Sequence, residues 1–399
     1  EYIEKKSLTN EDSFLLNIKK MKKNILVVSG FFPYPTLFGG TFDIWERIKG
    51  LCQLGYKVDL LYTDKAFPKE KDLAVVKSFV GKIYRVQRKN SIFQLFDKSP
   101  LQVLSRKNLE HIKLEDKYDI IILETEYVGR VLRNKTVRGD KVYLRVQNNE
   151  QKYFSNLSKS TANPLRKLYF FQESLKFRWY SKFIFNYADR LWFISSTEEM
   201  EYQKLINSNK SIHLPSPING GFAKQKLDNN NVLFIGSLFM DNNIQGLMWY
   251  LDYIHDDVCS NFPDYCLHIY GSTGVYSEKH FINKFKKFRR IHLHLNLENI
   301  EEAYINTSVF INPMLQGAGV KLKSINAIVN GLPLVATSTG SEGIGLVDKE
   351  MFYLADTPKD FSNAVARALK SPNKGGVVEA AQNHLNSNNY LKILESELK

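Results

Sequence analysis

Short apolar runs rich in β-branched residues alternate with helix-like segments along most of the chain, and this alternation limits the possible folds more than any other feature. It is typical of parallel sheets whose two faces are covered by helices. In the first series we predict strands at Ile25–Ser29, Val58–Thr63, Asp119–Thr125, Val142–Val146 and Arg190–Ser195, with helices over Thr41–Leu54 and Leu101–Glu115. In the second series we predict strands at Val232–Ile235, Leu267–Tyr270, Ile291–Leu295, Val309–Asn312, Pro333–Thr337 and Met351–Ala355.

The alternation pauses between residues 214 and 221, a stretch with two prolines and two glycines, and the polar run 228–231 follows. Two such series predict an α/β protein with two tandem Rossmann-like domains whose parallel sheets face a cleft. The predicted divisions are an N-terminal extension (1–20), a first domain (21–215), a linker (216–230), a second domain (231–375) and a C-terminal helix (376–399) that packs back on the first domain.

The chain of 399 residues carries a formal net charge of +13, which implies either an anionic partner or a tolerated basic surface. Its basic residues are spread out and match no recognisable nucleic-acid module, so we predict no nucleic-acid partner. No apolar run approaches the roughly 18 residues of a membrane-spanning helix. We therefore expect a cytoplasmic location, with the cytoplasmic face of the membrane as the alternative.

A glycine-rich loop with Gly317 and Gly319 lies between a predicted strand and a predicted helix, and Lys321 and Lys323 follow it directly. Glycines let a ligand approach the main chain, and the start of a helix carries partial positive charge. Glu342 follows the next predicted strand, so two loops meet at neighbouring strand ends. Together these features predict a phosphate-binding site.

The first domain offers a weaker signal of the same kind. The pair Gly39 and Gly40 opens the first predicted helix, which suits an anion, although taken alone the pair favours the alternative, a flexible turn capped by Thr41. Glu126 and the segment 145–150 lie at the ends of two strands, where polar groups could hold a sugar or act as a base. The alternative is that these carboxylates are solvated or cap helices.

Aromatic and basic residues interleave between Arg166 and Phe183. We predict a long helix whose aromatic face packs against the sheet, because a large domain needs such residues inside. A helix that lies on a membrane surface, with lysines outward and aromatic rings at the lipid boundary, is the alternative. The three cysteines and eight histidines lack metal-ligand spacing, and we predict no metal site.

At these residues the chain resembles the glycosyltransferases of the GT-B fold, and within them bacterial glycosyltransferase family 4. The resemblance rests on Gly39–Gly40, on Leu144–Glu150 with the following tyrosine, on Phe234–Ser237, and above all on residues 317–343. It implies that the second domain binds a nucleotide-diphosphate sugar and that the first binds a glycan, lipid-linked or protein acceptor. It also implies transfer without a cofactor or an obligatory metal, and with retention of the anomeric configuration.

The resemblance and the positions of polar residues at strand ends together give each candidate residue a predicted role. Catalytic roles fall to Lys321, Lys323, Glu150 and Glu126; donor binding to Gly39, Gly40, Gly236, Gly317, Gly319, Asn326 and Glu342; and acceptor binding to Arg145, Asn148 and Tyr153.

Two departures from the family pattern keep a second hypothesis open. Asn326 stands where the family commonly has a ribose-binding glutamate, and Gly236–Asn243 lacks the family's usual basic residues. An amide oxygen is a weaker acceptor than a carboxylate. The main hypothesis is an enzyme of bacterial surface glycan synthesis. The alternative is a non-catalytic, glycosyltransferase-like subunit that binds glycan or a partner enzyme.

Overall fold

The computed structural model describes residues 23–36, 39–89, 97–161, 163–206, 209–218, 223, 229–297, 300–317, 319–370, 374–387 and 389–399. The predicted N-terminal extension, 1–20, lies outside the described residues, as does most of the predicted linker.

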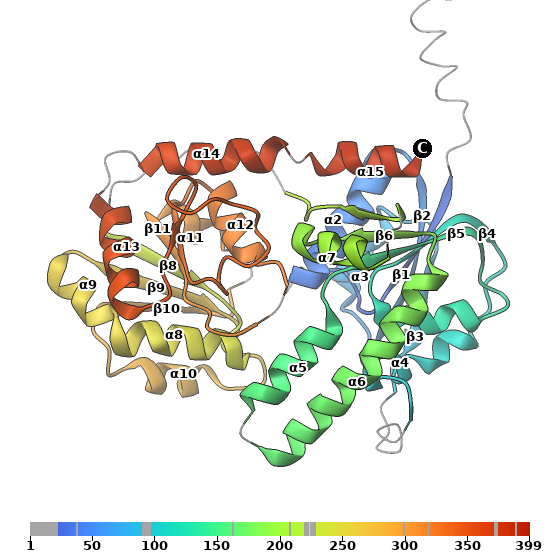
Figure 1. Ribbon diagram of the computed structural model, residues 1–399, viewed down its shortest axis with the longest axis horizontal. Coiled ribbons are helices and arrows are strands. Elements are labelled where there is room, and N and C mark those ends of the chain that lie inside the picture. Colours follow the sequence, from blue (N-terminus) through green and yellow to red (C-terminus); the bar gives the residue numbers. More distant parts are fainter. Residues whose placement is uncertain are drawn as a thin grey trace, which may run out of the picture.

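The first domain is built on a seven-stranded sheet in which every pair of neighbouring strands is parallel (Figure 1). Its order is β3-β2-β1-β4-β5-β6-β7. The strands are β1 (Asn24–Ser29), β2 (Lys57–Asp64), β3 (Ile83–Gln87), β4 (Lys117–Leu123), β5 (Arg138–Val146), β6 (Arg190–Phe193) and β7 (Ser211–His213). Two central strands, β1 and β4, carry apolar residues on both faces, at Ile25–Val28 and Ile120–Leu123, because helices cover both faces of the sheet.

The second domain repeats this plan with six parallel strands in the order β10-β9-β8-β11-β12-β13. They are β8 (Asn231–Ile235), β9 (Cys266–Gly271), β10 (Ile291–Leu295), β11 (Val309–Asn312), β12 (Leu334–Ala336) and β13 (Tyr353–Leu354). Two parallel sheets with the same winding confirm the predicted class of two tandem Rossmann-like domains.

Helices cover the faces of both sheets (Figure 1). In the first domain they are α2 (Gly39–Gln53), α3 (Glu70–Lys77), α4 (Leu101–Leu104), the 3₁₀ helices η2 (Lys107–Glu110) and η3 (Glu126–Arg133), α5 (Glu150–Ser160), α6 (Pro164–Tyr187) and α7 (Ser196–Ile206). In the second they are α8 (Asp241–Tyr253), α9 (His255–Asn261), α10 (Glu278–Phe285), α11 (Glu301–Ile305), α12 (Leu322–Val329) and α13 (Pro358–Lys370).

The predicted helix over Leu101–Glu115 is wrong beyond its first turn, since α4 ends at Leu104 and only a short 3₁₀ helix follows. Arg106 lies between the two helices, and its side chain is fully buried. Its guanidinium donates to the carbonyl of Gly30 and to the Thr63 hydroxyl, each at 3.0 Å. These bonds to the ends of β1 and β2 accompany the break between α4 and η2.

The C-terminal segment runs back from the second domain to the first as α14 (Lys374–Ser387) and α15 (Tyr390–Leu398), which lie along one side of both domains (Figure 1). Tyr390, Leu394 and Leu398 are buried in the core between α2 and the first sheet. Glu397 accepts a hydrogen bond of 2.8 Å from Arg190 at the start of β6. Residues 390–398 are thus part of the first domain's core.

Four buried charged residues form a cluster between α2 and the first sheet, and two of them, Asp43 and Arg47, belong to α2. Arg145 donates from Nε and Nη2 to the two oxygens of Asp43, at 2.9 and 2.8 Å. Arg47 binds Asp43 as well and donates at 2.7 Å to Glu124, while the Tyr390 hydroxyl accepts from Arg47 at 3.1 Å. Two cations and two carboxylates balance each other, as buried charges require.

The long helix α6 has two apolar sides, and the packing prediction is correct for only one of them. Phe177 and Ile184 are fully buried, but Phe171, Trp179 and Phe183 are exposed on another side. Among the helices of the described ranges, none combines the length and the apolar character needed to cross a membrane.

Candidate active site

The loop between β11 and α12 brings the predicted donor-binding residues to the carboxyl edge of the second sheet. Gly319 has a φ of +78°, a conformation that other residues adopt rarely. A Cβ atom there would also lie 2.1 Å from Oδ1 of Asn148, which follows β5 in the first domain. Position 319 therefore requires glycine, and the loop touches the predicted acceptor side.

Lys321 lies just before α12, and its side chain is only 5% exposed. Its ammonium group donates to the carbonyl of Gly319 at 2.6 Å and to Oε2 of Glu342 at 3.2 Å. Burial lowers the pKa of Lys321, although the charge of Glu342 acts in the opposite direction. Three predicted residues from two loops thus form one cluster, which also lies close to Gly317.

Lys323 points toward the loop that follows β8. Its Nζ donates to Oδ1 of Asn243 at 3.0 Å and lies 5.1 Å from the centre of the Phe234 ring. Burial, and then the charge of Lys321, lower the pKa of Lys323 to about 7. The amide of Asn243 donates in turn to the carbonyl of Ser237 at 3.1 Å, beside Gly236. In the described part of the chain no carboxylate forms an ion pair with Lys323.

The first domain contacts this cluster directly. A Cβ atom on Gly39, the first residue of α2, would lie 3.0 Å from the side chain of Leu322, and Gly40 is half-buried beside it. Lys152 of α5 lies 4.0 Å from Glu342 across the domain boundary. The cluster around Lys321 and Glu342 therefore lies at the interface of the two domains, with Gly39 and Lys152 on the side of the first domain.

Glu150 opens α5 and is buried near this boundary. Its Oε2 accepts a hydrogen bond of 2.7 Å from the Tyr127 hydroxyl. Burial raises the pKa of Glu150 to about 7, and the charge of Glu198 adds to the rise. A carboxyl group that titrates near neutral pH can exchange a proton with a sugar hydroxyl.

Sequence reasoning missed Glu198, Lys152 and Asn243. Glu198 lies in the first turn of α7, directly after β6, and accepts from the backbone amide of Asn149 at 3.3 Å. Its place after a strand is the same signal that pointed to Glu126 and Glu150, so it was available in the sequence. Asn243 and Lys152 carry no such local signal, because each is identified only by its distant partner.

The structure corrects the roles of two predicted residues. Arg145 is fully buried, and its guanidinium binds Asp43 and the carbonyl of Leu214, so it cannot contact an acceptor from this position. Glu126 is buried with its carboxyl bonded to Ser181 of α6. Burial raises the pKa of Glu126 well above its usual range. With its side chain buried against α6, Glu126 does not face the cluster around Lys321.

Two further predicted residues are half-buried. Tyr153 packs edge-to-face on Phe154, with 5.3 Å between ring centres, one turn after Glu150. Asn326 lies one turn beyond Lys323 on α12. Neither position contradicts the predicted contact with acceptor or donor.

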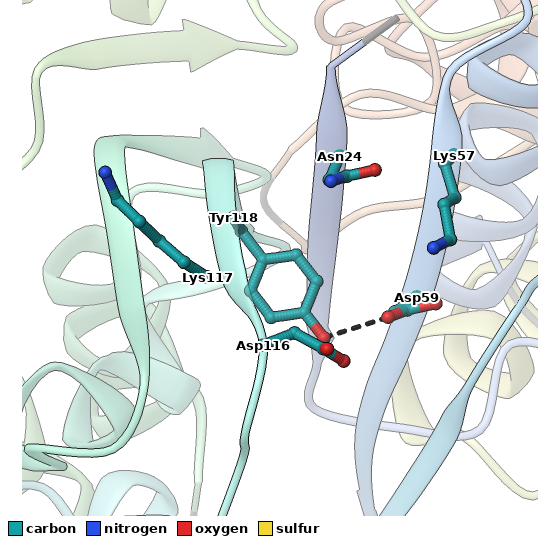
Figure 2. A pocket seen from close by; sticks show the side chains of 6 residues that line it. All are labelled: Asn24, Lys57, Asp59, Asp116, Lys117 and Tyr118. Carbon is teal, nitrogen blue, oxygen red and sulfur yellow. Dashed lines mark hydrogen bonds between the residues drawn. The ribbon is translucent and has the colours of Figure 1, made fainter. Parts of the chain in front are cut away.

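A small polar pocket lies at the other edge of the first sheet, where its strands begin (Figure 2). Tyr118 points into it and donates to Asp59 at 2.9 Å. Ligands of parallel α/β sheets bind beyond the carboxyl ends of the strands, so this pocket is not the candidate site. Its lining residues are Asn24, Lys57, Asp59, Asp116, Lys117 and Tyr118.

Comparison with known proteins identifies the family. Residues 229–371 match the family described as glycosyl transferases group 1. The chain is 37% identical over 371 residues to an uncharacterized 44.6 kDa protein in the cps region of Klebsiella pneumoniae, which covers 90% of this chain and 94% of that protein.

Solved structures share the fold at low sequence identity. A mutant of S. aureus TarM, in complex with Fondaparinux, alpha-GlcNAc-glycerol and UDP, has a TM-score of 0.67 and 11% identity, covering 94% of this chain and 99% of that one. The pneumococcal O-GlcNAc transferase GtfA, in complex with UDP and GlcNAc, has a TM-score of 0.60 and 10% identity, covering 94% and 98%. With the paired parallel sheets, these matches confirm the GT-B fold. The chain belongs to the group 1 glycosyltransferases.

Proposed function

We propose that this glycosyltransferase moves a sugar from a nucleoside-diphosphate sugar to a glycan, lipid-linked or protein acceptor during synthesis of a bacterial surface polysaccharide. The observation that carries the proposal is the pair of lysines at the start of α12: Lys321 binds the glycine loop, and Lys323 faces the neighbouring loop after β8. The UDP bound in the TarM and GtfA structures supports a nucleoside-diphosphate sugar as the donor. The relative in the cps region of Klebsiella pneumoniae supports a role in surface polysaccharide synthesis.

The chemical demand on the donor side is to stabilise the leaving diphosphate. When the bond between the sugar and the diphosphate oxygen breaks, its electron pair stays on that oxygen, and negative charge develops there. The ammonium group of Lys321 lies buried at the glycine loop that would hold it, and that of Lys323 lies half-buried beside the loop after β8. Fixed positive charges in such a site stabilise a developing anion more than they would in water.

On the acceptor side, Glu150 would accept a hydrogen bond from the attacking hydroxyl, whose oxygen forms the new bond to the sugar. The hydroxyl proton would pass to a departing phosphate oxygen or to Glu150, whose pKa of about 7 suits either direction of exchange. We propose retention of the anomeric configuration and no requirement for a metal, with the two lysines supplying the positive charge. Product analysis by NMR and turnover in EDTA test these two points.

Nucleoside diphosphates are expected to raise the melting temperature of the purified protein, because a ligand that binds only the folded state stabilises it. At one hundred times its dissociation constant a ligand adds about 2.7 kcal/mol. We would measure UDP, GDP, ADP, CDP and dTDP in parallel, and the base that gives the largest shift names the donor class. If none of the five shifts the transition and no donor sugar is turned over, the proposal is wrong.

Binding of the diphosphate is also expected to take up a proton at Lys323. Its pKa is about 7 in the free protein, so at pH 8 the amine is mostly neutral, and a diphosphate beside it raises that pKa. Affinity should therefore fall as the pH rises above 7. Calorimetry at pH 8 in two buffers of different ionisation enthalpy measures the uptake.

The control for proton uptake is a pair of lysine substitutions. Lys323→Met should abolish the uptake, whereas Lys359→Met, at an exposed lysine of α13, should leave it unchanged. The folding stability of the free protein depends on pH in the opposite direction from the affinity for the diphosphate. Between about pH 7 and the ordinary lysine value of 10.5, the unfolded chain binds more protons at this site, so this group makes stability rise with pH. Uptake that persists in Lys323→Met would assign the proton to another group.

A further inference from the structure

Helix α6 leaves a continuous apolar face uncovered along most of its length. We call this the α6 apolar face, and it consists of Leu165, Leu168, Phe171, Leu175, Trp179 and Phe183. Leu165 is 80% exposed, Trp179 71% and Phe183 53%. Successive members are three or four positions apart, so they line one side of the helix. At 1.5 Å per residue the face is about 27 Å long.

The fold does not need this face for its own packing. The opposite side of α6 already provides the buried contacts, since Phe177 stacks on Phe154 at 5.2 Å and Ile184 is fully buried. Single exposed apolar residues are common on protein surfaces, but a row of six on one helix is not. Such a row marks an interaction surface.

The charges on α6 indicate what kind of partner the face fits. The helix has five basic residues and one acidic residue, Glu173, which is buried and pairs with Lys176 at 3.2 Å. In the described part of the chain no ion pair involves the other four, which are Arg166, Lys167, Arg178 and Lys182. An apolar row whose charged neighbours are all cations complements a surface with an apolar interior and an anionic outer layer.

We propose that the α6 apolar face docks on an anionic membrane surface. Trp179, Phe183 and the leucines would enter the headgroup boundary, and the flanking cations, Arg178 and Lys182 among them, would bind lipid phosphates. A second copy of the chain fits less well, because it would bring like charges together across the contact. The membrane, unlike a second copy, supplies the counter-charge.

Docking in this orientation would place the lipid surface beside the acceptor side of the site. Helices α5 and α6 form a hairpin that projects from the first domain (Figure 1). Tyr127, which binds Glu150, packs on Phe177 of α6 with 5.9 Å between ring centres. The Tyr127 ring thus lies between Glu150 and the buried side of α6. The exposed side of α6 lies about one helix diameter, 10 Å, beyond that buried side. Delivery of a lipid-linked acceptor there rests on the proposed function, whereas the docking itself does not.

Co-sedimentation of the full chain with vesicles tests the docking. The chain should bind vesicles of phosphatidylcholine with 30% phosphatidylglycerol, should not bind pure phosphatidylcholine, and should dissociate as salt rises. The variant Trp179→Ser with Phe183→Ser should bind at least tenfold more weakly. The variant Arg178→Gln with Lys182→Gln should lose roughly 25-fold, about fivefold for each charge near the surface.

The matched control is Val275→Ser with Lys279→Gln, which changes an apolar residue that is 97% exposed and a nearby exposed lysine of the second domain. It should bind like the unaltered chain. Equal binding by all variants, or no binding to anionic vesicles, would overturn the proposal. The proposal would also be overturned if the chain formed a dimer in solution, the variant Trp179→Ser with Phe183→Ser dissociated that dimer, and the chain did not bind vesicles. The nucleotide-induced melting shift should survive in every variant, which separates this test from that of the donor site.

Discussion

The Lys323→Met variant is expected to lose transfer activity while its folded state becomes more stable. The amine of Lys323 has an amide rather than a carboxylate as its hydrogen-bond partner. Burying this amine without a counter-charge therefore lowers the free energy of unfolding of the free protein. Methionine fills a similar volume without that cost. Removing one group that stabilises a developing anion lowers kcat by about 10²–10³-fold. The measurements are donor turnover and the melting temperature of the same preparation.

Lys321→Ala should give a comparable loss of kcat without the gain in stability, because Lys321 is paired with Glu342 in the free protein. The exposed residue Lys359 provides the matched control, since Lys359→Met removes one positive charge from the same domain. Wild-type turnover in Lys323→Met would show that the second lysine does not face the diphosphate. A fall in stability in that variant would show that its ammonium group has a structural partner.

Arg145→Ala is expected to destabilise the first domain by about 3–5 kcal/mol, the usual effect of removing one member of a buried ion pair. Burial acts to raise the pKa of Asp43, but the charges of Arg145 and then Arg47 outweigh it and hold that pKa below its usual range. Without Arg145, the buried carboxylate of Asp43 keeps only Arg47 as a cationic partner, and the carbonyl of Leu214 loses its hydrogen-bond donor. Chemical denaturation of the purified variant measures the change.

The control is Arg138→Ala, at the exposed start of the same strand, which should change stability by less than about 0.5 kcal/mol. A variant that folds with unchanged stability but shows a raised KM for the acceptor would return Arg145 to its predicted binding role. A soluble but strongly destabilised variant with a normal acceptor KM would support the structural role.

The strand pattern was predictable because central parallel strands are buried on both faces and therefore read as unbroken apolar runs. The two strands that escaped prediction, β3 and β7, lie at the edges of the first sheet. In β3 only Val86 is buried, and β7 has three residues. Edge strands need fewer apolar residues, so their composition resembles that of loops.

The clustering of Gly319, Lys321 and Glu342 was predictable, because glycines, lysines and a helix start are neighbours in the sequence and Glu342 follows the next strand. Arg145 was misjudged because side chains alternate along a strand. Its neighbours Leu144 and Val146 pack into the core on one face, so Arg145 points to the other face, toward Asp43, 102 positions away. Lys323 and Asn243 are 80 positions apart. Contacts between residues so far apart in the sequence can be identified only from the three-dimensional structure.

The placement of α15 has a consequence for the order in which the molecule can assemble during synthesis. Tyr390 and Leu394 complete a core whose other members, such as Ile44 and Val58, leave the ribosome more than three hundred residues earlier. Domains usually fold in the order in which they emerge. Part of the first domain's apolar interior is therefore expected to stay uncovered until the second domain and α15 have been synthesised.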